Sequence, residues 1–255
     1  MWDWISALDK LRREAQPAVL LTVIRTTGST PRESGAKMIV LPDGSILGTI
    51  GGGNVEYQAI RDAVQCLTKS AGGVFEYPLT VTTGQCCGGS MELLMEVINL
   101  NPQLYIYGAG HVGQALCRVL ENTVFVPHLI DARAQWIGSP ELSARVVRHQ
   151  TEWLDFNNSA LWDKERVYAA VMTPDHAEDF EIVADLLKRP VRYLGLIGSN
   201  AKWAQFQHSL REMGFESSQL STVRCPIGVG NTGKAPAEIA ISVAAEILTH
   251  YHATL

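Results

Sequence analysis

The sequence predicts an α/β protein with two domains. We expect a smaller N-terminal α+β domain over residues 1–100 and a C-terminal Rossmann-like domain with a doubly wound parallel sheet over residues 101–255. The first observation is that, after residue 102, apolar strand-like runs alternate with amphipathic helical runs, which is typical of a parallel sheet covered on both faces. The second is a glycine loop of the form G-x-G-x-x-G after the first of these strands. The third is the length of 255 residues, which favours two cores over one.

The composition limits the classes of partner. The chain has 21 basic and 26 acidic residues, a net charge of -5, and no run of more than two Lys or Arg residues. Nucleic acid and anionic membranes are therefore not expected as partners. The first residues lack the basic and apolar regions of a secretory signal, and no window approaches the roughly 18 apolar residues of a membrane span. The cysteine count of 5 is odd and fits a reducing compartment, so we expect a cytoplasmic protein.

The N-terminal domain is predicted to open with a helix whose apolar residues, among them Trp4, Leu8 and Leu11, keep helical spacing. The turn sequence Pro42-Asp43-Gly44 between two apolar runs predicts a hairpin. The elements expected after the first helix are a strand at 18–25, hairpin strands at 36–41 and 45–50, a helix at 54–67, and strands near 74–79 and 90–98.

The C-terminal domain is predicted to alternate strands and helices. Strands are expected at 103–108, 125–132, 144–149, 166–173, 191–198 and 222–228, and helices at 112–122, 175–189, 200–214 and 236–251. The helix at 175–189 has acidic residues in its first turn and basic residues in its last, as the helix dipole prefers. Pro236 stands in the first turn of the last helix, where its missing N–H costs nothing.

The glycine loop GAGHVG contains Gly108, Gly110 and Gly113, and Asp131 follows at the end of the next strand. This context predicts a dinucleotide-binding loop, in which glycines let the backbone approach a pyrophosphate and the carboxylate accepts ribose hydroxyls. The ligand stays open, because the loop suits any phosphate-bearing cofactor, NAD(P) included, and a Rossmann fold without nucleotide also exists. His111, in the variable part of the loop, is expected to face solvent.

A second glycine cluster, Gly51, Gly52 and Gly53, precedes the helix at 54–67. One interpretation is a cradle of backbone N–H groups for a phosphate or for the edge of a pterin. The other is a tight strand-to-helix turn with Asn54 as the cap.

Polar residues follow two predicted strands of the parallel sheet. Asp175 and His176 come after the fourth strand, and Ser199 and Lys202 after the fifth. Ligands of open α/β sheets lie at this edge, so these four residues are candidate site residues. The alternative is two helix caps and a solvated lysine.

The adjacent pair Cys86 and Cys87 lies in a glycine-rich stretch. Neighbouring Cα atoms are about 3.8 Å apart, less than the roughly 4.4 to 6.8 Å of a relaxed disulfide, so a bridge between them is disfavoured. A structural zinc site lacks a C-x-x-C partner motif. What remains is a thiol or thiolate that neighbouring N–H groups can stabilise. Because extended backbone alternates its side chains, only one of the two should face a ligand.

Several of these stretches together resemble one known family. In chain order they are GSTPRESGAKMIV, GTIGGGNVE, GQCCGG, YGAGHVG, DHAEDFE, GLIGS, and CPIG followed by GKAPAEIAISVAAEIL. They resemble the XdhC/CoxI family of xanthine dehydrogenase accessory proteins over nearly the whole chain. One departure is Pro174, where the family commonly has a histidine before the Asp-His pair, and this puts in doubt any role that needs two histidines there.

The resemblance implies a non-catalytic chaperone that matures molybdenum hydroxylases. Such a protein binds molybdenum cofactor (molybdopterin), associates with a cysteine desulfurase that supplies the sulfido ligand, and inserts the cofactor into an apo hydroxylase of the xanthine dehydrogenase type. By the same resemblance, Cys86 or Cys87 would lie near the molybdenum, and the two glycine loops would contact a phosphate or nucleotide. Molybdenum and its dithiolene are soft, which suits a thiolate ligand.

Two other functions remain open on the residues. An NAD(P)-dependent oxidoreductase would use His176 or Lys202 as its acid-base group, with Asp175 beside them, and Asp131 as its ribose ligand. A thiol redox sensor would use the cysteine pair. A homodimer is expected because two-fold symmetry is the commonest assembly.

Overall fold

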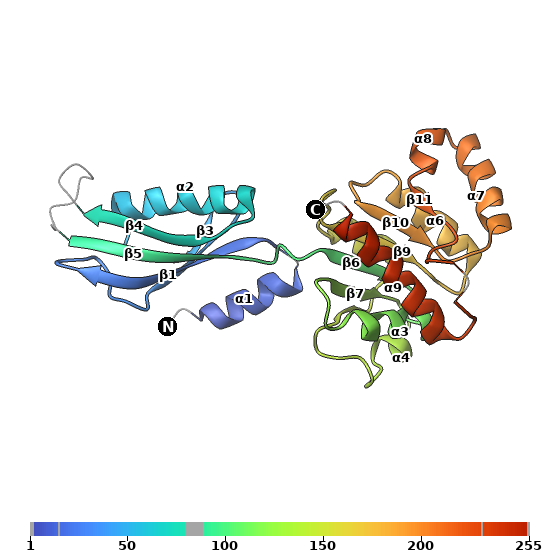
Figure 1. Ribbon diagram of the computed structural model, residues 1–255, viewed down its shortest axis with the longest axis horizontal. Coiled ribbons are helices and arrows are strands. Elements are labelled where there is room, and N and C mark those ends of the chain that lie inside the picture. Colours follow the sequence, from blue (N-terminus) through green and yellow to red (C-terminus); the bar gives the residue numbers. More distant parts are fainter. Residues whose placement is uncertain (1–2, 15, 80–88, 231, 254–255) are drawn as a thin grey trace. The chain divides into compact units, whose positions relative to one another are not determined.

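The computed structural model describes residues 3–14, 16–79, 89–230 and 232–253 (Figure 1). The chain divides into two compact units, Met1–Leu100 and Asn101–Leu255. Each unit has its own sheet and its own core.

The first unit is an antiparallel sheet with helices on its faces. Its helices are α1 (Trp4–Arg13) and α2 (Gly53–Lys69), and its strands are β1 (Ala18–Thr27), β2 (Lys37–Val40), β3 (Ile46–Gly48), β4 (Gly73–Leu79) and β5 (Gly89–Ile98). The strand order is β3-β2-β1-β5-β4, and every neighbouring pair is antiparallel.

Alternation along the strands divides the apolar residues of this sheet between two faces. Met91, Leu93 and Met95 of β5 are buried in one cluster with Val55 and Ala59 of α2. On the opposite face, Leu11 of α1 is buried against Leu20 and Ile39. The sheet therefore has a helix on each face.

The second unit is a parallel sheet with helices on both faces. Its strands are β6 (Gln103–Tyr107), β7 (Val126–Ile130), β8 (Val147–His149), β9 (Val167–Val171), β10 (Tyr193–Leu196) and β11 (Val223–Arg224). Its helices are α3 (His111–Leu120), α4 (Ala134–Ile137), α5 (Trp153–Ser159), α6 (His176–Leu186), α7 (Asn200–Glu212), α8 (Ser217–Leu220) and α9 (Pro236–His252). The strand order is β11-β10-β9-β6-β7-β8, which corresponds to the 3-2-1-4-5-6 order of the Rossmann fold. The predicted fold class is confirmed.

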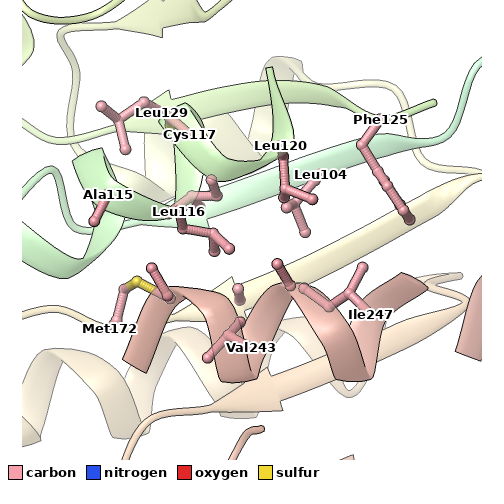
Figure 2. Packing of buried hydrophobic residues seen from close by; sticks show 14 of the residues in the cluster. Leu104, Ala115, Leu116, Cys117, Leu120, Phe125, Leu129, Met172, Val243 and Ile247 are labelled. Carbon is pink, nitrogen blue, oxygen red and sulfur yellow. The ribbon is translucent and has the colours of Figure 1, made fainter. Parts of the chain in front are cut away.

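Two apolar clusters fill the space on either side of this parallel sheet. On one side α3 and α9 pack together, and Ile247 and Val243 of α9 lie in one buried cluster with Leu116 and Leu120 of α3 (Figure 2). On the other side α6 and α7 cover the sheet with Ile182, Leu186 and other buried side chains. Each fully buried Leu or Ile contributes about 1.5–3 kcal/mol to the free energy of folding. Both helix layers therefore fix the position of the sheet, including the edge where its strands end. In the described part of the chain no helix, the 17-residue α9 included, is long and apolar enough to cross a membrane.

The structure differs from the sequence predictions mainly in its short elements. Helices α4, α5 and α8 were not predicted, because runs of four to seven residues are too short to show a helical period. The strands of the parallel sheet are shorter than predicted, for example 167–171 for β9 against 166–173. The interpretation of Asn54 as a cap is wrong, because α2 begins at Gly53 with Gly52 at the cap position and no side-chain cap.

A histidine pair, buried His128 and partly buried His149, links the neighbouring strands β7 and β8. His128 Nε2 lies 2.8 Å from Gln103 Oε1, and His128 Nδ1 lies 2.9 Å from His149 Nε2. An amide oxygen only accepts, so the Nε2 of a neutral His128 carries the proton and donates to Gln103. The unprotonated Nδ1 of His128 then accepts a hydrogen bond from His149 Nε2. Burial lowers the pKa of His149 from 6.5 to about 4.

This pair makes the stability depend on pH. The folded pKa of His149 is below its unfolded value, so the unfolded chain binds more protons between these values, and stability falls as the pH falls through that window. Going from about pH 7.5 to about pH 5, we expect the free energy of unfolding to drop by about 2 kcal/mol through this group. Urea denaturation at both pH values, with His149→Gln as the comparison, measures the contribution. An identical pH dependence in both proteins would contradict it.

Candidate functional site

A hollow of the second unit lies at the carboxyl ends of β6, β7 and β9. Its volume is about 140 Å³, and its lining includes Gly108, Asp131, Arg133, Glu152, Trp153 and Glu178. We call it the switch-point hollow, because β6 and β9 are the neighbouring strands from which the chain winds in opposite directions. In open α/β sheets ligands bind at this place.

The three glycines of the GAGHVG loop have different reasons to be glycine. Gly108 has φ +105°, and a Cβ there would lie 2.5 Å from the carbonyl oxygen of Met172. A Cβ at Gly113 would collide with the carbonyl oxygen of Gly108. Gly110 has φ -65°, and an added Cβ would meet no atom within 4 Å. Chain packing therefore explains Gly108 and Gly113, whereas the space beside Gly110, at the N-terminus of α3, is free for a ligand.

Asp131 has both carboxylate oxygens occupied by its own chain. Oδ1 accepts from Arg133 N at 2.9 Å and Nε at 2.8 Å, and Oδ2 accepts from Ala109 N at 2.7 Å and Arg133 Nη2 at 2.6 Å. Against the opposing effect of burial, these bonds hold the pKa of Asp131 below its ordinary value. A ribose hydroxyl would have to compete with Arg133 for this carboxylate. The ribose role of Asp131 stays a prediction, and the structure gives it a second role, orienting Arg133.

Glu178 and Glu152 make the rest of the hollow acidic. Burial raises the pKa of Glu178 against the opposing effect of a hydrogen bond with Thr173, and the charges of Asp131 and Glu152 are among those that raise it further. Arg133 is the one cationic side chain among the lining residues. Sequence reasoning missed Arg133, Glu152, Trp153 and Glu178. A signal was available, because Arg133, Glu152 and Trp153 come shortly after predicted strands, close to the strand ends where Asp131 was also expected.

A second, more open hollow of about 270 Å³ lies beside the ends of β9 and β10. Thr173, His176, Ser199 and Lys202 line it. The structure therefore brings together three of the four polar residues predicted at this edge. Asp175 lies at the start of α6, where its carboxylate accepts from Ala177 N at 2.8 Å, and Ser199 accepts from Lys202 N at 3.1 Å at the start of α7. Both predicted caps are present, and the candidate roles in a ligand site stay predictions.

Lys202 is buried in an ion pair. Its side chain is 9% exposed, and its Nζ lies 2.5 Å from Asp179 Oδ2 and 3.1 Å from the carbonyl oxygen of Ile197. Asp179 has no exposed side-chain surface, and its Oδ1 accepts from the backbone N–H and the hydroxyl of Thr173. The interpretation of Lys202 as a solvated lysine is wrong. The pair joins α6, α7 and the end of β9.

Sequence reasoning treated Asp179 as one of the acidic residues of the first turn of α6. A signal was available, because Asp179 shares the spacing of Ile182, Val183 and Leu186, which are buried. A carboxylate on an apolar stripe needs a partner.

The glycine cluster before α2 is occupied by an internal carboxylate. Glu56 Oε2 accepts from Ile50 N at 3.0 Å, from Gly52 N at 3.1 Å and from the Thr49 hydroxyl at 2.5 Å. Gly51 N donates to the Thr49 hydroxyl at 3.0 Å. The glycines are explained by the turn, since φ is positive at Gly51, Gly52 and Gly53. These contacts favour the tight-turn interpretation, with Glu56 in place of the expected cap. A cofactor contact there stays a prediction.

Cys86 and Cys87 lie outside the described residues. Among the described cysteines, Cys66 and Cys117 are buried and Cys225 is partly buried. Burial raises the pKa of Cys225 to about 11, which disfavours a thiolate there. No group of three or more His, Cys, Asp or Glu side chains within the described ranges could hold a metal ion.

Comparison with known families agrees with the topology. The XdhC Rossmann domain matches residues 104–247. The chain belongs to the XdhC and CoxI family. The match described as the XdhC and CoxI family covers residues 11–78.

Two curated Escherichia coli K12 proteins are relatives of this XdhC-family chain. YqeB, an uncharacterized protein, is 31% identical over 243 residues, which are 94% of this chain and 44% of YqeB. The chain thus spans less than half the length of that relative. PaoD, named a molybdenum cofactor insertion chaperone, is 23% identical over 262 residues, covering 90% of this chain and 82% of PaoD.

A solved structure shares the fold. A crystal structure from Bacillus halodurans, described as a xanthine dehydrogenase, superposes with a TM-score of 0.52 and 19% identity, covering 98% of this chain and 96% of that one. At this identity the likeness concerns the fold alone.

Proposed function

We propose that this XdhC-family chain is a maturation factor that binds molybdenum cofactor and inserts it into a hydroxylase of the xanthine dehydrogenase type. The observation that carries the proposal is the match to PaoD over most of both chains, together with the family match to both units. The switch-point hollow, with the open space beside Gly110, supports it as a place for a phosphate-bearing heterocycle. In this proposal the cofactor is cargo that must be released to the hydroxylase. An open site allows that release more readily than a closed cage of ligands.

The finer parts of the proposal concern sulfuration and partners. We propose that a cysteine desulfurase meets the chain while the cofactor is bound, so that the molybdenum receives its sulfido ligand before insertion. The soft thiolate of Cys86 or Cys87 would hold the molybdenum side of the cargo. We further propose a homodimer acting in the cytoplasm.

The test of this function is the amount of cofactor that copurifies with the protein from cofactor-replete cells. We expect wild type to carry molybdopterin, and one of Cys86→Ala and Cys87→Ala to carry about tenfold less, the equivalent of roughly 1.4 kcal/mol of binding. Gln85→Ala, a change in the same stretch that keeps both thiols, should retain the wild-type amount.

Two outcomes would decide against it in different ways. Equal cofactor in all four proteins would remove the thiol assignment and leave the carrier function. The absence of molybdopterin from wild type, measured as its fluorescent oxidation product, would remove the carrier function itself.

A nicotinamide-dependent oxidoreductase is the second candidate, favoured by the strand order and the glycine loop. The contacts of Asp131 with Arg133 and of Lys202 with Asp179 weigh against it, because they occupy the groups that this activity would use. Isothermal titration with NAD and NADP tests it. Heat of binding that is lost in Asp131→Ala would favour this candidate.

A further inference from the structure

The switch-point hollow has two further carboxylates beside the Asp131 and Arg133 pair. Glu178 and Glu152 both line it, and in the stretch 89–230 that contains the hollow neither lies within 4.0 Å of a Lys, Arg or His nitrogen, although the charge of Glu178 acts on Arg133 over a longer distance. A phosphate group is disfavoured beside two such carboxylates, because like charges repel over short distances. The phosphate of a ligand therefore belongs at the N-terminus of α3 beside Gly110, and the hollow takes the other, uncharged end of the ligand.

Arg133 limits the orientation of that end. Asp131 binds the guanidinium through Nε and Nη2, so Nη1 is the remaining terminal nitrogen of a held, planar donor group. Asp131 is therefore a positioning residue for Arg133. The hollow combines carboxylate acceptors, one guanidinium donor and the indole of Trp153. This set fits a flat heterocycle that has adjacent N–H donors and a carbonyl acceptor on its rim.

We propose that the switch-point hollow binds the 2-amino-4-oxopyrimidine edge of a pterin, with Glu178 accepting from the 2-amino group and the ring N3–H, and Arg133 donating to the 4-oxo group. The proposal rests on the proposed function, since it specifies the end of the molybdenum cofactor that this unit recognises. Two neighbouring donors match the two oxygens of one carboxylate. Adenine and cytosine place their amino donor beside a ring-nitrogen acceptor, not beside a second donor, and do not make this match. A volume of about 140 Å³ suits one aromatic ring system, since a cavity of roughly 150 Å³ takes up benzene.

Matched ligands test this assignment without loaded cofactor. The probes are 6,7-dimethylpterin and 6,7-dimethyllumazine, which differ in having an amino or an oxo group at position 2. Wild type is expected to bind the pterin about tenfold more tightly than the lumazine in a fluorescence titration, the usual effect of one bidentate contact. In Glu178→Gln the preference should fall to about twofold or less, because an amide offers one acceptor in place of two.

Glu181→Gln is the control, because Glu181 lies on the same helix and is exposed to solvent. It should keep the wild-type preference. Equal binding of the two probes by wild type, or an unchanged preference in Glu178→Gln, overturns the proposal. A preference for GDP over IDP without one for pterin over lumazine also overturns it and assigns the hollow to a guanine nucleotide.

The copurification experiment separates this inference from the function on which it rests. Wild type that carries molybdopterin but does not distinguish pterin from lumazine overturns the pterin site and leaves the carrier function standing. Wild type that distinguishes the probes but carries no molybdopterin supports the site and overturns the carrier function.

Discussion

Replacing Lys202 with methionine is expected to lower the free energy of unfolding by about 3–5 kcal/mol. The replacement leaves the Asp179 carboxylate in a position with no exposed side-chain surface and without its cation. Thr173 continues to donate to Oδ1, but Oδ2 loses the ammonium group 2.5 Å away. A buried, unpaired carboxylate is among the most costly changes that one substitution makes.

Urea denaturation measures this effect, and two variants isolate its cause. Lys164→Met removes the charge of a lysine that is exposed on a loop and should leave the stability nearly unchanged. In the double variant Lys202→Met with Asp179→Asn, most of the lost stability should return, because the carboxylate that needed a cation is gone. If the single and double variants are equally unstable, the loss comes from packing of the lysine stem and not from the charge.

Gly113→Ala is expected to lower the free energy of unfolding by about 3 kcal/mol, whereas Gly110→Ala should change it by less than about 1 kcal/mol. The two residues lie in the same loop. The alanine methyl at position 113 would collide with the Gly108 carbonyl, and that at position 110 would enter open space. The methyl at 110 would instead occupy the place where a phosphate approaches the N-terminus of α3.

Thermal or urea unfolding measures the first part of this prediction, and the cofactor content of purified Gly110→Ala measures the second. We expect Gly110→Ala to fold and to carry less cofactor than wild type. Similar stability losses in the two variants would contradict the separation of roles. A folded Gly110→Ala with full cofactor would show that the phosphate does not use this loop.

The elements of the fold were largely predictable, because helical and strand periods depend on nearby residues. The alternation after residue 102 and the GAGHVG loop together indicated the Rossmann fold, which the strand order confirms. Periodicity does not reveal which side chains meet across elements. Lys202 and Asp179 are 23 residues apart on different helices, so their pairing is a result of tertiary packing.

The candidate site was predictable in its place and less so in its contacts. Asp131 stands at the end of β7, where the fingerprint puts it, but its bond to Arg133 depends on a turn of the chain that the sequence pattern does not specify. The acidic side of the switch-point hollow was missed because Glu152 precedes the first residue of α5 and Glu178 lies in the first turn of α6. Acidic residues at these positions are already explained by the helix dipole. The cysteine pair lies outside the described residues and stays a sequence prediction.

The carboxylate of Glu56 gives the loop before α2 a ligand that the chain itself carries. Its contacts with Thr49, Ile50 and Gly52 hold the loop in an anion-binding arrangement when no outside ligand is present. Because Glu56 is tethered to the loop by only a few residues, its carboxylate competes with outside anions at a high effective concentration. For short flexible linkers this effective concentration is in the millimolar range. An outside phosphate reaches these N–H groups only by displacing the Glu56 carboxylate. The loop is therefore expected to bind an outside anion only when that anion is concentrated or binds tightly.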